Sequence, residues 1–470
     1  MSSGRSDSQI IADFAVSFER SRILDEHVAQ CGRALADTMA VAIAAQSEST
    51  SRRALQYLDS LAPGLPDRWA KNLPGTASLW GLRRSSTVEG AALFNGIAAH
   101  VLDFDDASSP MSGHPSVALL PALVALAEAR DASGMRLVSA YVVGFEICCK
   151  LGRALDLSHY SRGWHMTSTV GTIAATAACG HLLGLDAEQI SNAIGLAVAQ
   201  TGGTRENFGT DAKSFQVGQV NATAIRAALL AEQDFTASPR SLDGKAGYAA
   251  LYSAGEDLTP ALATLGSLPL EIESSGIEVK KYPACYGIHR PLDGLFDIMS
   301  EREFGLADLE RIDIETSYGA LAPLVRHLPR NGTEGKFSME YSIAAAIADR
   351  GIGLSTYSDE AVARREIAPY LARIVAREAS DTMVPRWASI SISFKDGEKR
   401  TRRVEALRGS PGLPLSFEDL FAKVSDCLAW GNSSIRPSDL LHAASNLKVL
   451  SVRALMPLIE RPTVAVKEVQ

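Results

Sequence analysis

One stretch, NGIAAHVLDFDDASSPMSGHPS from Asn95 to Ser116, decides how the fold of the chain is assigned. His100 and Asp103 are three positions apart and therefore share a helix face. Asp105 and Asp106 stand where the apolar pattern breaks into Ser, Pro and Gly, and the apolar segment VALLPALVALAEA follows. The pattern predicts a helix that ends in an acidic loop, with a second helix after it. Aspartates in such places commonly only cap helix ends, so the stretch alone does not establish a site.

Length and composition are those of an ordinary globular protein. At 470 residues the chain exceeds the size of a usual single core, so we expect two domains. Hydrophobic residues make up 46%, charged residues 21%, and the formal net charge is −8, so neither nucleic acid nor a membrane surface is expected as a partner. An anionic substrate must then be met by a local cluster of positive charge.

Cysteine usage and hydropathy predict the compartment. The cysteines are scattered, with no CxxC pair and no metal-like spacing to histidine, which indicates reduced thiols. The opening residues lack an apolar segment of signal-peptide length, and no later apolar run reaches membrane-spanning length without polar interruption. We therefore expect a soluble, cytoplasmic protein.

Residues 1–274 read as the N-terminal part of a helical domain. Apolar positions recur at helical spacing from residue 10 to about 45, and ASLWGLRRSSTVEGAALFNGIAAHVLDFDD is expected to resume helix after a loop at 62–75. Residues 139–155 and 169–183 form two further apolar helices, the second rich in Ala, Gly and Thr as expected of a buried central helix.

Two side chains stand at predicted helix starts. The segment YSRGWHMTSTVG places His165 where backbone N–H groups and the helix dipole favour an anion, although Trp164 and His165 could equally only staple the helix start. The glycine-rich loop GGTRENFGTDAKSF carries Arg205 and Lys213 before a long helix of small residues. A lysine on a loop is mostly solvated surface. Lys213, however, stands at the start of the following helix, where it is expected to face the helix bundle.

Residues 275–408 read as a mixed α+β domain. IEVKKYPACYGIHRPLDGLFDI places His289 just before a helix expected to open with Pro291. RIDIETSY and RWASISISF alternate as strands, the second is followed by a Lys-Asp-Gly hairpin turn, and the helix SMEYSIAAAIAD lies between them. Residues 409–470 hold the linker GSPGLPLS and closing helices expected to pack back on the first domain.

The assembled motifs resemble those of the MmgE/PrpD family, which includes 2-methylcitrate dehydratase, cis-aconitate decarboxylase and iminodisuccinate epimerase. The motifs are NGIAAHVLDFDD with GHPS, GWHMTSTVGT, GTDAK, KKYPACYGIHRPLD, EGKFSMEYSIA, and DGEKR followed by GSPGLPLS, in the family's order over nearly the whole chain. The resemblance implies a mainly α protein with a large all-helical domain, a smaller α+β lid domain, an active-site cleft between them and a homodimer.

The resemblance also implies the positions of the site residues. The expected catalytic residues are Asp103, His114, His165, Lys213 and His289, and the expected substrate-binding residues are Lys213, His289, Ala107, Arg205 and Tyr341. Lys213 and His289 are expected to position carboxylates. His165 and His114 would exchange protons with the substrate, and Asp103 would orient or charge a neighbouring imidazole. Which histidine is the base and which the acid stays open.

We expect these catalytic residues to converge on one cleft, with residues 275–408 closing as a lid and bringing His289 to the site. Lys213 is expected to have no protein partner before a substrate binds. The other histidines are taken as structural or surface residues, namely His27, His100, His159, His181, His327 and His442. His100 is the first exception to consider, because it shares a helix face with Asp103.

The sequence departs from the family's pattern at several positions. Ala107 stands where the family has threonine, Met166 and Ser168 replace Pro and Gly, and Gln216 stands where histidine is common. The stretch up to His114 is one residue longer than in the decarboxylases. The fold assignment survives these changes. The choice of substrate and reaction does not, because Ala107 lacks a hydroxyl that could hold a substrate group.

Several functions stay open on this sequence. Substrates of the family are di- or tricarboxylates, and a carbanion-like charge next to a carboxylate can be handled by imidazoles and an ammonium. The chain shows no GxGxxG after a strand, no P-loop, and no HxH or HExxH pair, so neither an organic cofactor nor a metal is expected. The leading expectation is a lyase that dehydrates a 2-methylcitrate-like tricarboxylate. An iminodisuccinate-type epimerase, a cis-aconitate-type decarboxylase and an inactive carboxylate-binding homologue are the alternatives.

Overall fold

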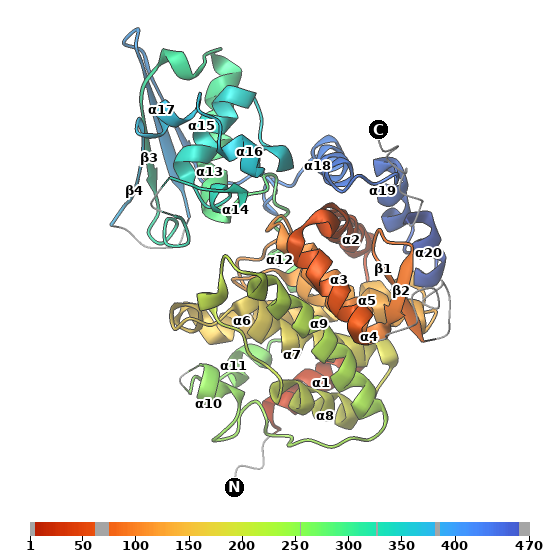
Figure 1. Ribbon diagram of the computed structural model, residues 1–470. Coiled ribbons are helices and arrows are strands. Elements are labelled where there is room, and N and C mark those ends of the chain that lie inside the picture. The colour runs from red at the N-terminus through yellow and green to blue at the C-terminus, as the bar shows by residue number, and fades with distance from the viewer. Residues whose placement is uncertain (1–4, 62–74, 254, 326–327, 381–385, 460–470) are drawn as a thin grey trace. The chain divides into compact units, whose positions relative to one another are not determined.

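The computed structural model describes residues 5–61, 75–253, 255–325, 328–380 and 386–459, which form two compact units (Figure 1). Unit 1 runs to Val279 and resumes at Phe421, and unit 2 runs from Lys280 to Leu420. Composition had suggested boundaries near 275 and 409. The linker GSPGLPLS is part of unit 2, and the second boundary falls inside helix α18 (Phe417–Trp430), because packing rather than composition decides where a compact unit ends.

Unit 1 is built mainly from helices. Its elements are α1 (Asp7–Ser17), α2 (Asp25–Ala44), α3 (Ser49–Leu61), β1 (Thr76–Leu79), β2 (Arg84–Thr87), α4 (Val88–Val101), α5 (Pro115–Ala129), α6 (Gly134–Ser161), α7 (Met166–Leu183), α8 (Ala187–Val198), α9 (Asp211–Glu232), α10 (Tyr248–Tyr252), α11 (Thr259–Leu262), α12 (Glu271–Ser274), the end of α18, α19 (Pro437–Ser445) and α20 (Val452–Ile459). None of the described helices is both long and apolar enough to cross a membrane.

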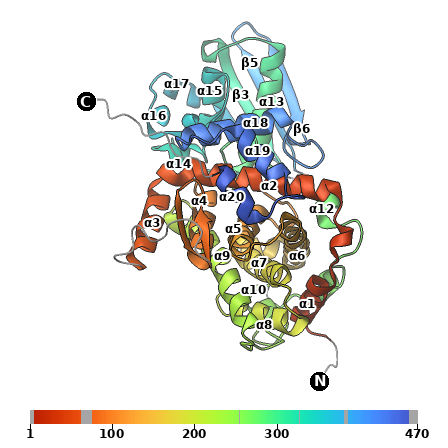
Figure 2. The same cartoon turned by 90° about the vertical axis from the view of Figure 1, so that its right-hand side faces the viewer.

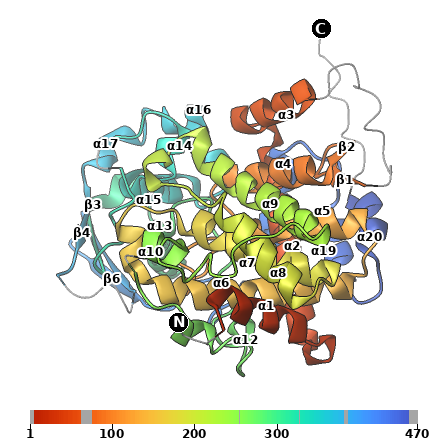
Figure 3. The same cartoon turned by 90° about the horizontal axis from the view of Figure 1, so that it is seen from below.

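Helix α7 is the central helix of unit 1. It packs against α5, α6, α8 and α9 (Figure 3), and its residues from Met166 to Gly180 are all buried. Gly171 allows α5 to approach closely, since a Cβ atom there would lie 2.7 Å from the Cβ of Ala118. The hydroxyl of Thr172 donates to the carbonyl of Ser168, so the polar side chain is satisfied within the helix. This confirms the expectation of a buried central helix.

The prediction of helix immediately after residue 76 is wrong. Strands β1 and β2 form an antiparallel hairpin there, and helix α4 begins only at Val88. The side chain of Thr87 accepts a hydrogen bond from the N–H of Gly90 and so caps α4, and a carboxylate of Glu128 binds the backbone and hydroxyl of Ser78. These tertiary contacts hold the hairpin in place. The loop expected at 62–75 lies, except for Gly75, outside the described residues.

Unit 2 is a mixed α+β domain, as expected. Its elements are α13 (Tyr286–Glu301), β3 (Leu309–Thr316), α14 (Gly332–Gly335), α15 (Met339–Asp349), α16 (Asp359–Val362), α17 (Ala368–Leu371), β4 (Ile374–Glu378), β5 (Ala388–Phe394) and β6 (Lys399–Val404). The sheet order is β4-β3-β5-β6, with β4 parallel to β3 and the other neighbours antiparallel. Alternate residues of β3 and β5, such as Ile312 and Ile390, pack with α13 and α15 in one core (Figure 2).

The start of α13 differs from the prediction. The helix begins at Tyr286, so His289 lies inside it, and Pro291 is accommodated within the helix rather than opening it. A proline near the start of a helix removes only one backbone hydrogen bond, here the one to the carbonyl of Gly287. The backbone of His289 is therefore fixed by the helix.

Candidate active site

Four helix ends in unit 1 present the candidate site residues. Helix α4 ends with Leu102 as its C-cap, and Asp103 follows in the left-handed conformation, with φ of 53°. His114 is the N-cap of α5, His165 is the N-cap of α7, and Lys213 lies in the first turn of α9. These helices pack against one another. Three of the four residues thus stand at helix N-termini, where partial positive charge favours an anion.

Lys213 forms an ion pair with Asp103. Its Nζ lies 2.6 Å from Oδ1 of Asp103, and the two side chains are only 12% and 10% exposed. The expectation that Lys213 has no protein partner is therefore wrong. The left-handed conformation, which aspartate tolerates better than most residues, ends α4 and turns the Asp103 side chain toward α9. Sequence spacing does not reveal this pair, because the two residues are on different helices.

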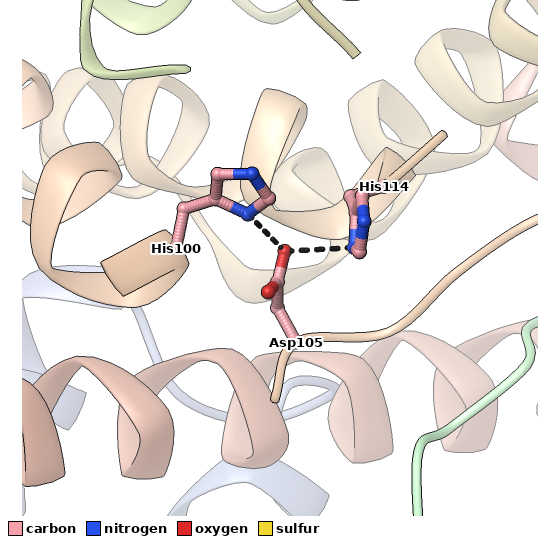
Figure 4. Close-up of side chains that lie close together, drawn as sticks. All are labelled: His100, Asp105 and His114. Carbon is pink, nitrogen blue, oxygen red and sulfur yellow. Dashed lines mark hydrogen bonds and ion pairs between the residues drawn. The ribbon is translucent and has the colours of Figure 1, made fainter. Parts of the chain in front are cut away.

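Asp105 binds two imidazoles at once. Its Oδ2 atom lies 2.8 Å from Nδ1 of His100 and 3.1 Å from Nδ1 of His114 (Figure 4). Burial opposes the negative charge of Asp105, but the two imidazoles hold the pKa of this carboxyl well below its usual range. Burial also lowers the pKa of His100 to about 4, so this ring is neutral at physiological pH.

The contacts of His114 define its protonation form. Its Nδ1 lies 2.7 Å from the backbone carbonyl of Asp106, and a carbonyl only accepts, so Nδ1 carries the proton. In the neutral ring Nε2 then holds the lone pair, and this atom lies 4.0 Å from Oδ1 of Asp103. The imidazole is thus placed between the carboxylates of Asp103 and Asp105. Its lone pair is on the side of the Asp103–Lys213 pair.

Gln216 fixes the protonation form of His165 in the same way. The amide nitrogen of Gln216 donates to the carbonyl of Thr204 at 3.0 Å, so its oxygen is left to accept from Nδ1 of His165 at 2.7 Å. Burial, aided by the neighbouring His100 and Lys213, lowers the pKa of His165 well below its usual range. His165 is therefore a neutral imidazole with its lone pair on Nε2. The departure at Gln216 from the family's pattern has a structural role here.

The rings form a continuous contact. His100 stacks on His165 with centroids 5.9 Å apart and meets His114 edge-on at 4.8 Å. Phe208 meets His165 edge-on at 5.0 Å and lies 5.4 Å from Nζ of Lys213. A positive charge on one of these imidazoles therefore disfavours protonation of the others.

The remaining members of the acidic loop are anchored. Asp106 accepts from the backbone N–H of Ser116 at 3.1 Å and from its hydroxyl, and burial raises the pKa of Asp106 well above its usual range. Lys423 of α18 pairs with Asp37 at 2.5 Å and donates to the carbonyl of Phe104 at 2.8 Å. The three aspartates of the DFDD motif thus have three different partners, which the sequence does not distinguish.

Glu278 ties the same loop from the other side. Its backbone exchanges hydrogen bonds with Ala107 at 2.8 and 3.0 Å, and its carboxylate accepts from the N–H of Ser109 at 2.7 Å. Sequence reasoning missed Glu278, Lys423 and the role of Asp105. Asp105 carried a signal, because it stands in the quoted motif. Lys423 carried none, because it is 319 positions from Phe104 along the chain.

Three other expected residues have contacts of their own. The guanidinium of Arg205 lies 3.8 Å above the ring of Tyr160 and donates to the Tyr160 carbonyl at 3.0 Å. In unit 2, His289 is fully buried and donates to the carbonyl of Ala284 at 3.1 Å. Tyr341 is a core residue of unit 2 whose hydroxyl donates to the carbonyl of Thr356 at 2.6 Å. The structure brings together Asp103, His114, His165 and Lys213, and the participation of His289 through lid closure stays a prediction.

A metal ion is another reading of the cluster formed by His100, Asp105 and His114. One donor atom from each lies within 4.8 Å of the others. The missing HxH or HExxH motif does not address this grouping, because the ligands come from a helix end and a loop. However, both imidazoles direct Nδ1–H groups at Asp105, so hydrogen bonding accounts for the arrangement.

Unit 1 gathers imidazoles, carboxylates and an ammonium, and it is accompanied by a smaller α+β unit. The chain belongs to the MmgE/PrpD family: the MmgE/PrpD N-terminal domain matches residues 9–261 and the C-terminal domain matches residues 282–436. It is 29% identical to the cis-aconitate decarboxylase of Homo sapiens over 358 residues, 72% of this chain and 73% of the relative. It is 24% identical to that of Aspergillus terreus over 360 residues, 71% and 73% of the two chains.

Proposed function

We propose that the protein is a cofactor-independent lyase that acts on a tricarboxylate by proton transfer next to a carboxylate. The observation that carries the proposal is the neutral His165, with its Nε2 lone pair, near the Lys213 ammonium. The ammonium and the helix N-termini attract a carboxylate and stabilise the enolate-like charge that develops on it. An ammonium has three N–H donors, so its bond to Asp103 does not by itself prevent it from binding a substrate carboxylate.

Decarboxylation of cis-aconitate is the first reaction to test, because the relatives described above are cis-aconitate decarboxylases. In this reaction the carbon–carbon bond to one carboxylate breaks and carbon dioxide leaves. The electron pair left on the carbon skeleton takes up one proton. Lys213 would stabilise the transient negative charge, and His114, between two carboxylates, is the group we assign to deliver the proton.

Dehydration of a 2-methylcitrate-like hydroxy acid is the second candidate. It is favoured by the protonation form of His165, because a neutral imidazole with a free lone pair on Nε2 is suited to removing a proton from carbon. The hydroxyl group would then leave as water, taking a proton from Nε2 of His114 when that ring is protonated. An iminodisuccinate-type epimerase needs the same first step, followed by return of a proton to the opposite face.

Incubation with cis-aconitate, 2-methylcitrate and iminodisuccinate in deuterated water, followed by NMR, separates these reactions. Decarboxylation gives a five-carbon dicarboxylate that carries one new deuterium. Dehydration removes the signal of the hydroxyl-bearing carbon, and epimerisation exchanges a C–H for C–D without changing the composition. His165→Phe should abolish each of these changes, whereas His27→Phe, at a buried histidine paired with Glu273, should not. Binding of a carboxylate without any conversion or exchange would instead support an inactive carboxylate-binding homologue.

A further inference from the structure

Asp105 has an unusual set of contacts for a fully buried carboxylate. One oxygen, Oδ2, accepts from both His100 and His114, while Oδ1 has no hydrogen-bond partner among the described residues. Figure 4 shows the carboxylate lying between the two rings. A buried carboxylate keeps its charge only when hydrogen-bond donors or positive charges compensate for lost hydration. The two imidazole N–H groups are therefore what keep Asp105 ionised.

The two donors are not equivalent. Nδ1 of His114 is shared between Asp105, at 3.1 Å, and the carbonyl of Asp106, at 2.7 Å. Nδ1 of His100 contacts Asp105 alone, at 2.8 Å. His100 thus donates its Nδ1 hydrogen bond to this carboxylate alone. His114 is oriented by both the Asp106 carbonyl and the Asp105 carboxylate.

The other ring nitrogen of His100 makes no hydrogen bond in the described structure. Its Nε2 is buried and has no hydrogen-bond partner among the described residues. Its ring is edge-on to His114 and stacked on His165. The side chain therefore combines one directed hydrogen bond with contacts to both proton-transfer groups.

We propose that His100 is a positioning residue. Its hydrogen bond orients the Asp105 carboxylate and keeps it charged, so that Asp105 stabilises His114 whenever Nε2 of His114 carries a proton. The inference rests on the proposed lyase function, in which His114 exchanges a proton with the substrate. The charged groups that face His114 are Asp105 at Nδ1 and Asp103 at Nε2, and Asp103 is in turn paired with Lys213. Asp105 does not take the proton itself, and its charge balances the imidazolium, as the aspartate does in a serine-protease triad.

Two substitutions of His100 test the proposal because they keep different halves of the imidazole. In His100→Asn the side-chain amide lies near the position of Nδ1 and can still donate to Asp105. In His100→Gln the amide reaches the position of Nε2 instead and leaves the Nδ1 position empty. We expect the Asn variant to keep kcat within about threefold of wild type. The Gln variant should lose about 10- to 100-fold in kcat at unchanged KM, the effect of removing one hydrogen bond to a charged group.

A second readout does not need a substrate. The Nδ1–H proton of His114 should exchange slowly with water in wild type and in His100→Asn, and about tenfold faster in His100→Gln, measured by NMR on protein with 15N-labelled histidine. The same two substitutions at His27 are the control, because that buried imidazole also binds a carboxylate, at 3.0 Å from Glu273. Neither His27 variant should change kcat or the exchange of His114.

The outcomes separate the inference from the proposed function. If wild type converts none of the three carboxylates, the proposed function fails, while the exchange measurement still decides whether His100 positions Asp105 and His114. Equal kcat values in the Asn and Gln variants, or unchanged His114 exchange in the Gln variant, would overturn the inference. If His100→Gln does not fold, Asp105→Asn replaces it, because an uncharged amide removes the stabilising charge at nearly constant volume. Wild-type kcat in Asp105→Asn would equally overturn the inference.

Discussion

Replacing Lys213 by methionine tests the centre of the proposed site. The substitution removes the ammonium but keeps an unbranched side chain of similar length. In wild type the ammonium binds Asp103 at 2.6 Å, and both side chains are almost entirely removed from solvent. Lys213→Met therefore does two things at once. It removes the group that would hold the substrate carboxylate, and it leaves the Asp103 carboxylate without its cation.

Both effects have a magnitude that follows from the geometry. Loss of one charge-assisted contact to a substrate carboxylate costs about 2–5 kcal/mol, which corresponds to about 30- to 5,000-fold in kcat/KM. Removing one member of a buried ion pair destabilises a protein by about 3–5 kcal/mol. Because about a tenth of each side chain is still exposed, we expect the lower end of that range for the fold. Lys213→Met should thus lower both activity and the thermal unfolding midpoint.

A double-mutant cycle separates the two effects. In Lys213→Met with Asp103→Asn the buried charge is neutralised, so the unfolding midpoint should recover most of its loss while kcat/KM stays low. Lys150→Met is the matched control, because Lys150 is also in unit 1, is 15% exposed and binds Glu271 at 3.1 Å. It should lower stability without lowering kcat/KM. Steady-state kinetics and thermal unfolding are measured on the same preparation of each variant.

One result would refute the reasoning. If Lys213→Met loses stability but keeps kcat/KM within about threefold, Lys213 is a structural partner of Asp103 and another group holds the substrate carboxylate. Lys213→Arg provides an additional check, since it keeps the charge but not the compact ammonium. A largely active Arg variant beside an inactive Met variant would show that the charge itself is required.

Three further predictions follow from the same contacts, and a fourth follows from the family. The free energy of unfolding should fall as the pH drops from 6.5 to 4. Burial lowers the pKa of His100 to about 4, so in this range the unfolded chain binds a proton that the folded chain excludes. The full effect is about 3 kcal/mol, and urea unfolding of His100→Asn should show a shallower decline. Gln216→Leu should lower kcat about tenfold, because it removes the acceptor for Nδ1 of His165, whereas Gln219→Leu, one turn along α9 and bonded to Thr223, should not. Prolonged treatment with a metal chelator should leave the rate unchanged, since hydrogen bonds account for the contacts of Asp105; loss of activity that added Zn²⁺ restores would contradict this. Light scattering should give twice the chain mass if the homodimer implied by the family forms.

The individual candidate residues were accessible from sequence to different degrees. Asp103, His114, His165 and Lys213 were predicted because the resemblance to the family implies these positions, and local patterns add that they stand at helix ends. Their partners were not predictable in this way. Lys213 and Asp103 are 110 positions apart, so only the packing of α9 against α4 makes them an ion pair. The role of Gln216 depends in turn on the placement of Thr204, which orients its amide.

The sequence by itself determined the family and the mainly helical unit with a smaller α+β unit, and it named candidate site residues. The fold class follows from periodicity, and the family and the candidate residues follow from the resemblance carried by motifs of a few residues. It did not determine the hairpin before α4, the start of α13, or the division of labour among Asp103, Asp105 and Asp106. Those depend on which groups meet after the helices pack, because a buried carboxylate takes its pKa and its role from the donors that tertiary structure places around it. For this reason the pairing of Asp105 with His100 and His114 became visible only in the folded structure.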